Sequence, residues 1–323
     1  YYLRGNISFA TGAFEHCPEQ QNKALHHARV AGSPEWEANA LSGLTDAEYA
    51  RGHMRNTLDN YERCLVLCRD NGLLSIEARN ASIGAVARRY LGDQAAAVED
   101  LKTAAALAER IHDVRGSMIA HLVWGEMLID MGAYDAAEGP LETALSTARS
   151  LSNGRIELYG IYELARQAWA RSQKTEAIDL LKRAFEITKQ TGITFHGPRL
   201  FALKARFAHN RDACMQALAD GQALVDQGGN AHNILWFHRD AIDACLAVDD
   251  PTAARTHADA LTNFITKDDL PWARFFAARG YALADAADGN GDMVALALVH
   301  EQGRHLTLNI ALPEIEAAQS ELA

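Results

Sequence analysis

The segment HEQGRH, from His300 to His305, has the residue types of a zinc peptidase motif but not its spacing. In His-Glu-x-x-His the histidines are four residues apart and share one helix face, so both imidazoles reach one zinc ion. Here they are five residues apart, which is about 140° around a regular helix. A less common peptidase form tolerates this spacing but needs a downstream glutamate and a cleft. With so little chain after His305, we interpret the segment as a solvated helix end.

Two further groupings resemble ligand sites but lack essential members. Cys64 and Cys68 have i, i+4 spacing, yet both occupy positions that elsewhere in the chain hold small residues, so we interpret them as core residues. The segment Asp288 to Asp292 begins like a calcium loop, but Met293 and Val299 replace the glycine and glutamate that such a loop requires. Phosphate-binding loops, dinucleotide fingerprints and nucleophile elbows are missing from the sequence. We expect no enzyme activity, no metal and no cofactor.

The composition favours a helical protein that avoids nucleic acids and membranes. The 323 residues are 48% hydrophobic, and alanine and leucine dominate while only 7 prolines occur. A formal net charge of −11 disfavours binding to phosphate backbones. No apolar run approaches the ~18 residues of a membrane span. Five cysteines without a framework spacing indicate free thiols and a cytoplasmic protein. Because the chain starts at Tyr1 with a helix-like segment, we expect the C-terminal part of a longer protein.

A forty-residue period organises the first part of the chain. Turn residues recur at Gly12, Gly52, Gly92, Gly132 and Ser172. Small or apolar residues recur in step with them, for example at Ala24, Cys64, Ala104, Ala144 and Ala184, and at Cys17, Thr57, Ala97, Ala137 and Ala177. This agreement indicates an internal repeat. In residues 113–151 one amphipathic helix ends at Gly132 and a second follows, and small residues on both let the helices approach closely.

The unit resembles the tetratricopeptide repeat, because Gly125, Ala137, Leu141 and Ala144 occupy the places of its signature. The usual unit has 34 residues, so the longer period implies longer helices. The resemblance implies an all-α, right-handed α-α superhelix of about eight helix-turn-helix repeats. Such long repeats are similar to those in the C-terminal regions of bacterial class III adenylate or guanylate cyclases with an ATPase module, and to those of LuxR-type regulators.

The repeats divide into a well-matched part and a degenerate part of one continuous solenoid. Residues 1–192 contain repeats 1–5, of which the first has a truncated first helix. Residues 193–323 contain repeats 6–8, in which the signature is weaker, and a capping helix that Pro313 opens. Asp250 and Pro251 form a helix start in the seventh repeat. Roughly seventeen helices result.

The fourth repeat contains a local fault, because Gly139-Pro140 stands inside its expected second helix. Proline at this place cannot donate to the carbonyl of Ala136 and would clash with it, at a cost of about 3 kcal/mol in a regular helix interior. We therefore expect the second helix either to start late, near Glu138, or to kink there.

The resemblance also implies a binding surface, because the first helices of this repeat family line a concave groove. The matching positions are Asn39, Ser42, Asp46, Tyr49, Arg79, Ser82, Arg89, Tyr159, Tyr162, Arg166, Trp169, Trp236, Arg239 and Asp243. In the fourth repeat they are Ile119, Leu122, Glu126 and Ile129, which form an apolar patch. Aromatic residues beside arginines suit the capture of a peptide or an acidic segment.

These observations predict a non-catalytic, regulatory interaction domain. We expect its partner to be a protein or peptide, which includes other domains of the same parent chain, and neither nucleic acid nor membrane. The expected parent is a larger bacterial signalling protein such as an adenylate or guanylate cyclase. The alternative is the repeat domain of a LuxR-type transcription activator that senses a small ligand or peptide.

Overall fold

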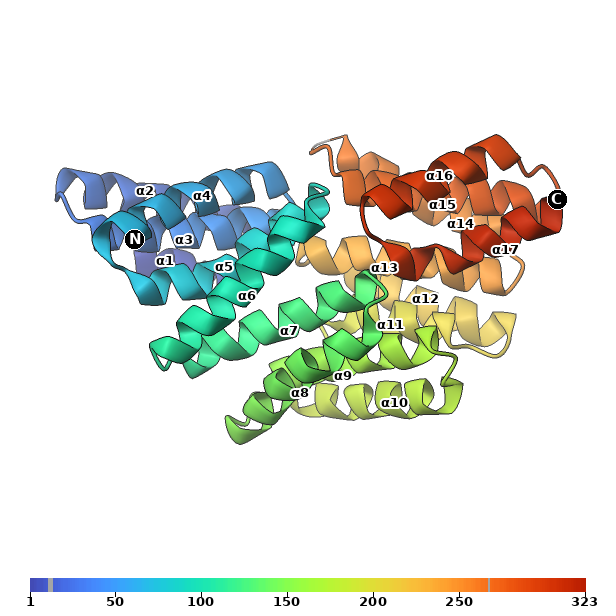
Figure 1. Ribbon diagram of the computed structural model, residues 1–323, viewed down its shortest axis with the longest axis horizontal. Helices are drawn as coiled ribbons and strands as arrows, with labels where there is room; N and C mark the ends of the chain where they lie inside the picture. Colours follow the sequence, from blue (N-terminus) through green and yellow to red (C-terminus); the bar gives the residue numbers. More distant parts are fainter. Residues whose placement is uncertain (11–13, 267) are drawn as a thin grey trace. The chain divides into compact units, whose positions relative to one another are not determined.

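A computed structural model describes residues 1–10, 14–266 and 268–323, and in these residues the chain is an array of helices without strands (Figure 1). Contacts divide the chain into two compact units. The first comprises Tyr1–Trp124 and Asn230–His232, and the second comprises Gly125–Gly229 and Asn233–Ala323. The all-α repeat architecture expected from the sequence is confirmed. The division falls inside a helix of the fourth repeat. The change in repeat quality expected at residue 192 stays a prediction.

The helices up to this division follow one another as antiparallel pairs. They are α1 (Tyr2–Ala10), the 3-10 helix η1 (Phe14–His16), α2 (Cys17–Val30), α3 (Pro34–Arg51), α4 (Met54–Asn71), α5 (Leu74–Tyr90), α6 (Gln94–Arg110) and α7 (Val114–Asp130), in which the division lies.

The remaining helices continue the same alternation, and the last is the expected capping helix. They are α8 (Tyr134–Ser150), α9 (Gly154–Ala170), α10 (Lys174–Thr191), α11 (Gly197–Arg206), α12 (Arg211–Asp226), α13 (Ala231–Ala247), α14 (Pro251–Ile265), α15 (Pro271–Ala287), α16 (Met293–His305), η2 (Asn309–Ala311) and α17 (Pro313–Leu322). The expected start of α14 is confirmed, because the Asp250 side chain accepts a hydrogen bond from the amide of Ala253.

A left-handed residue stands between successive helices at intervals of twenty residues. Positive φ angles occur at Gly32, Gly52, Gly72, Gly92, His112, Gly132, Ser152, Ser172 and Gly192. The sequence pattern identified every second member of this series, and Gly12 of that set lies outside the described residues. The other members mark the turns between repeats. Glycine is common at these turns because it has no Cβ to clash in the left-handed region.

Small residues in the first helix of a repeat make room for a large residue in the second. In the fourth repeat, a Cβ on Gly125 would lie only 2.6 Å from Cγ of Leu141. Ala137 and Ala144 flank Leu141 on α8, and all three are buried. The forty-residue period is therefore a packing period, in which each small residue fixes how closely two helices approach.

Of the two outcomes expected for the second helix of the fourth repeat, the late start is wrong and the kink stays a prediction. α8 begins at Tyr134 and continues through Pro140 to Ser150. Ala136 and Gly139 are exposed, so water can bind the carbonyl that Pro140 leaves without a helical donor. Ala137 and Leu141 are buried on either side of the fault. Their packing holds the helix together where its backbone bonding is interrupted.

No helix of the described residues is long and apolar enough to cross a membrane.

Candidate functional site

The second unit contains a cluster of mostly buried charged side chains on its odd-numbered helices, which are the first helices of their repeats and the capping helix. We call this set the inner cluster. Its members are Glu126 and Asp130 of α7, Glu163 and Arg166 of α9, Arg199 and Arg206 of α11, Arg239, Asp240 and Asp243 of α13, Arg279 of α15, and Glu314 of α17.

Three ion pairs of the inner cluster follow one rule: an arginine on one first helix bonds a carboxylate on the preceding first helix, 36 residues earlier. Arg166 Nη2 donates to Asp130 Oδ1 at 2.6 Å. Arg199 Nη2 donates to Glu163 Oε1 at 2.9 Å, and Arg279 Nη1 donates to Asp243 Oδ1. These pairs link α7 to α9, α9 to α11, and α13 to α15. The inner faces of consecutive repeats are thus joined by charge.

Trp236 on α13 lies at the centre of this arrangement. The guanidinium carbons of Arg166 and Arg199 are each 4.3 Å from the centroid of its ring, and that of Arg239 is 4.4 Å away. Each contact has the geometry of a cation–π interaction. Across the same centre, the Tyr162 hydroxyl donates to Asp240 Oδ2 at 3.0 Å. Arginines that would repel one another are held together by an aromatic face and by the carboxylates around them.

Burial and neighbouring arginines shift the pKa of two carboxyl groups in the inner cluster in opposite directions. Burial raises the pKa of Glu163 to about 7, although Arg166 and Arg199 act in the opposite direction. Burial also opposes the charged form of Asp243, but Arg279 and Arg206 outweigh it and hold the pKa of this carboxyl below its usual value. Such a network costs desolvation free energy that its hydrogen bonds must offset, so loss of one partner is expensive.

One cavity opens beside the inner cluster, and we call it the inner cavity. Its volume is about 380 Å³, and it is lined from five odd-numbered helices. The lining residues are Trp169, Arg206, Asp243, Leu246, Ala247, Leu283, Ala286, Ala287, Glu314, Ala317, Ala318 and Glu321. Apolar side chains form most of this wall, and charged groups are few and placed together. A binding site for a peptide side chain or a small molecule has the same character.

Arg206 is the charged centre of the inner cavity. Its Nη2 lies 3.0 Å from Asp243 Oδ2 and 3.1 Å from Glu314 Oε1, and its Nη1 lies 3.7 Å from Asp240 Oδ1. The pKa of Arg206 is raised above its usual value. Burial acts to lower this pKa, but the carboxylates of Asp243, Glu314 and Asp240 outweigh burial. The guanidinium therefore stays charged and holds α11, α13 and α17 together.

The aromatic wall of the inner cavity is Trp169, which is half-buried. Its ring stacks on Phe207 with centroids 4.2 Å apart and planes 17° apart. Lys174 Nζ lies 5.4 Å from the centroid of the same ring. The indole is therefore fixed in orientation while part of it faces the cavity.

The structure divides the expected groove positions of the second unit into two groups. Trp169 and Asp243 line the inner cavity. Tyr162, Arg166, Trp236 and Arg239 are at most 2% exposed and form the interior of the inner cluster. Tyr159 lies beside them and donates its hydroxyl proton to Glu126 Oε2 at 2.6 Å. Sequence reasoning did not name Arg206 and Glu314, because the sixth repeat and the capping helix lack the signature used for the mapping.

The expected positions of the first unit are spread over two helices. On α3, Asn39, Ser42, Asp46 and Tyr49 are half-buried, and burial raises the pKa of Asp46 to about 7. On α5, Arg79 is exposed and its Nε donates to the Ser75 carbonyl at 2.9 Å. Ser82 and Arg89 are buried on the same helix. Their role in binding stays a prediction.

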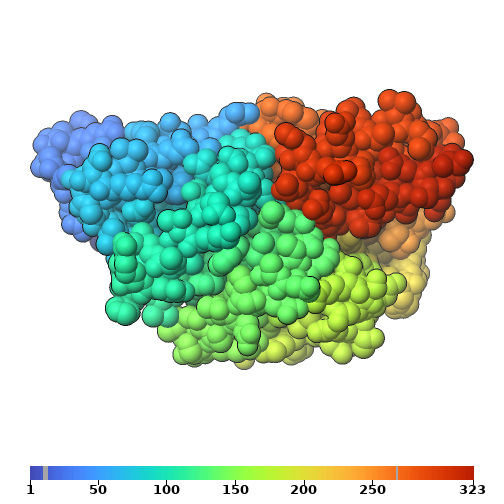
Figure 2. Space-filling view, in the orientation of Figure 1, coloured from blue at the N-terminus to red at the C-terminus, as the bar shows by residue number. Residues whose placement is uncertain are grey.

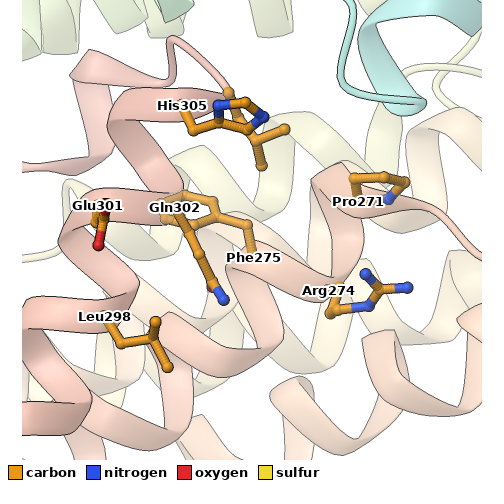
Figure 3. A pocket seen from close by; sticks show the side chains of 8 residues that line it. Pro271, Arg274, Phe275, Leu298, Glu301, Gln302 and His305 are labelled. Atoms are coloured by element: carbon orange, nitrogen blue, oxygen red, sulfur yellow. The ribbon is translucent and has the colours of Figure 1, made fainter.

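The HEQGRH segment contributes to a different cavity, between α15 and α16, of about 350 Å³. Figure 3 shows its lining, in which Glu301, Gln302 and His305 of α16 face Pro271, Arg274 and Phe275 of α15. His300 is engaged elsewhere, with Nε2 at 3.0 Å from Glu316 Oε1. Among the described residues there is no group of three or more histidine, cysteine or acidic side chains placed to hold a metal ion.

Cys64 and Cys68 lie in the apolar core of the first unit, as their repeat positions predict. Their sulfur atoms are 3.9 Å apart, and the Cys64 thiol lies 3.4 Å from the carbonyl oxygen of Ala38.

The fold and the inner faces of its helices define a tetratricopeptide-like helical repeat protein. No family model matches the chain, and no curated protein matches it. Among solved structures, the chain is similar to the Rap conjugation gene regulator of the plasmid pLS20, determined in complex with the Phr* peptide. The TM-score is 0.61 at 16% sequence identity, over 89% of this chain and 77% of that chain. At this identity the likeness concerns the fold, and it confirms the expected class of helical repeat.

Proposed function

We propose that the chain is a non-catalytic regulatory repeat domain that binds a peptide or protein segment in the inner cavity. This proposal rests on one observation: every residue that lines the inner cavity belongs to the first helix of a repeat or to the capping helix. A repeat protein presents its concave face through these helices. The similar Rap regulator was solved with a peptide bound, which supports the same kind of ligand here.

The lining chemistry favours a segment with an apolar anchor. Trp169 offers a fixed aromatic face, and the neighbouring alanines leave space for a partner side chain. Aromatic residues and arginines in such pockets commonly contribute most of the binding energy. The volume of the inner cavity also suits a small molecule. Binding of a small ligand is therefore the alternative that the experiment below must distinguish.

We further propose that the domain belongs to a larger bacterial signalling protein, such as an adenylate or guanylate cyclase, with a LuxR-type activator as the alternative. The support is the forty-residue repeat, which is long for a tetratricopeptide-like unit. The sequence that precedes Tyr1 in the parent gene tests this directly. A cyclase or ATPase domain there would support the proposal, and an unrelated domain would refute it.

The binding proposal is tested by selection from a random peptide library displayed on phage, with the full chain as bait. We expect enriched peptides whose affinity falls at least about tenfold on Trp169→Ala, since aromatic anchors of this kind are worth about 2 kcal/mol or more. The matched control is Trp36→Ala, because Trp36 is an exposed tryptophan of the first unit.

Three outcomes decide the proposal. Enriched peptides that lose affinity with Trp169→Ala and keep it with Trp36→Ala support a peptide site in the inner cavity. Peptides that bind both variants like the unchanged chain, or no enrichment at all, overturn it. A metabolite that stabilises the chain through Trp169 when no peptide does would favour the small-ligand alternative.

A further inference from the structure

The capping helix α17 is held to the second unit by few contacts. Of its side chains only Ile315 is fully buried. It packs against α15 and α16, and Figure 2 shows these C-terminal helices at the surface. A helix of about ten residues is not stable in water by itself, so its order depends on these contacts. Of the elements that form the inner cavity, α17 therefore has the least to hold it in place.

One carboxylate of α17 nevertheless reaches two arginines of the inner cluster. Glu314 Oε1 lies 3.1 Å from Arg206 Nη2, and Glu314 Oε2 lies 3.0 Å from Arg279 Nη2. These arginines belong to α11 and α15. A capping helix needs to cover only the last repeat, whereas this contact reaches α11 of an earlier repeat. Ile315, the next residue, supplies the apolar contact of the helix. A carboxylate and a branched apolar side chain, side by side, anchor α17 on the inner face.

The charge balance of the inner cluster depends on Glu314. Five arginines face six carboxyl groups when α17 is present, and Glu314 is the only one of these that α17 supplies. Removal of Glu314 would leave Arg206 with Asp243 and Asp240, and Arg279 with Asp243 as its carboxylate partner. Any other occupant of this position must therefore bring an anionic group.

We infer that α17 is a built-in occupant of the inner face, and that the partner of this domain is an acidic segment which displaces it. The partner presents a carboxylate beside a branched apolar residue, as Glu314 and Ile315 do. This inference rests on the proposed function and specifies its ligand. The chain is acidic overall, but without α17 both Arg206 and Arg279 lose a carboxylate partner, so an acidic segment fits here.

Hydrogen exchange on the full chain tests the inference. The first comparison uses Glu314→Gln and the matched control Glu316→Gln, since Glu316 lies on the same helix and pairs with the partly exposed His300. We expect Glu314→Gln to raise the exchange rates of the α17 amides at least about tenfold, and Glu316→Gln to change them less than about threefold, because exposed pairs contribute little. Amides of α15 and α16 keep their rates in both variants. Ile315→Ala gives a second test of the same opening.

The second comparison adds a synthetic peptide with the sequence of residues 313–323 to the unchanged chain. Because the tethered helix has a high effective concentration, the peptide is used at about 1 mM or more. We expect this peptide to accelerate amide exchange in α17. A peptide in which glutamine replaces the glutamate that corresponds to Glu314 should leave the exchange rates of α17 unchanged.

The outcomes separate this inference from the proposed function. The inference is supported if α17 exchanges faster in Glu314→Gln and also with the added peptide, and if the peptide acts only when it carries the glutamate that corresponds to Glu314. Exchange of α17 as slow as that of α15 in every variant overturns it, because α17 is then a fixed cap. Library peptides that bind through Trp169 without accelerating α17 exchange leave the proposed function intact and overturn the inference. If neither the library nor the 313–323 peptide yields binding, both fall.

Discussion

Arg199 donates to Glu163 across 2.9 Å, and both side chains are almost fully buried although they lie 36 residues apart in the sequence. The same separation joins Arg166 to Asp130 and Arg279 to Asp243. Charged pairs therefore connect the inner faces of neighbouring repeats in the second unit. These buried pairs lie behind the inner cavity, and of their members Asp243 also lines it.

Loss of one buried partner is expected to destabilise the chain strongly. Arg199→Met leaves Glu163 and Glu126 without the guanidinium that lies 2.9 Å and 3.5 Å from them. We expect a loss of about 3–5 kcal/mol in the free energy of unfolding. Urea unfolding followed by circular dichroism measures it.

The control for this prediction is a pair with the same distance and little burial. Arg183 also lies 2.9 Å from a glutamate, Glu157, but its side chain is 52% exposed. Arg183→Met should change the free energy of unfolding by less than about 1 kcal/mol. Equal losses in the two variants would show that burial does not set the strength of these pairs.

Two tryptophans separate the structural part of the site from its open part. Trp236 is fully buried among three arginines, whereas Trp169 is half-buried at the inner cavity. Trp236→Ala should lower the free energy of unfolding by about 3–5 kcal/mol. Trp169→Ala should lower it by no more than half as much and should mainly affect binding. A Trp169→Ala variant that unfolds as readily as Trp236→Ala would place Trp169 in the core.

The fault in α8 should be a site where substitution increases stability. Gly139 is exposed, and nothing lies within 4 Å of a Cβ added there. Gly139→Ala should raise the free energy of unfolding by about 0.5–1 kcal/mol, because glycine is a poor helix former. Pro140→Ala should raise it by up to about 3 kcal/mol, since the helical hydrogen bond is restored.

Gly125 provides the opposite case in the same repeat. An added Cβ would lie 2.6 Å from Cγ of Leu141, so Gly125→Ala should destabilise the chain by about 1–3 kcal/mol. Thermal unfolding of the three variants, compared with the unchanged chain, measures the signs. A stabilising Gly125→Ala would contradict the packing period described above.

A buried histidine and a half-buried one beside it should make the chain sensitive to mild acid. Nδ1 of His238 lies 3.0 Å from Nδ1 of His257. Burial lowers the pKa of His238 to about 3 and that of His257 to about 4, from 6.5 in the unfolded chain. Between pH 6.5 and 4 the unfolded chain therefore binds more protons than the folded chain, so the free energy of unfolding falls as the pH falls.

The double variant His238→Gln, His257→Gln isolates this contribution. From pH 7 to pH 4.5 it should lose at least about 1 kcal/mol less stability than the unchanged chain. Urea unfolding at several pH values measures the difference. Parallel pH curves would show that the two histidines are not held neutral in the folded state.

The repeat architecture could be predicted from the sequence because its determinants are local. Turn residues recur every forty positions and indicate where helices end. Small residues recur with the same period and indicate how closely the helices pack. The same reasoning was wrong about a late start of this helix, because packing of Ala137 and Leu141 maintains the helix through Pro140. Propensity is a weak guide where buried contacts flank the fault.

The candidate site could be predicted only in part because its contacts are long-range. Trp169 and Asp243 were found from repeat positions, and both line the inner cavity. Tyr162 and Asp240 are 78 residues apart, and Arg206 and Glu314 are 108 residues apart. Such contacts depend on the curvature of the helical array in the second unit, and no local sequence pattern specifies this curvature. The sequence therefore indicated a groove face without showing which of its charges are enclosed.

The central claim is that the inner cavity is the binding site, and hydrogen exchange with a selected peptide tests it most directly. On saturation of the full chain with a library-derived peptide, we expect slower exchange in the helix segments around Trp169, Arg206, Asp243 and Leu283, which line the cavity. Protection confined to the first unit, or to the cavity between α15 and α16, with unchanged exchange at these four segments, would contradict the account.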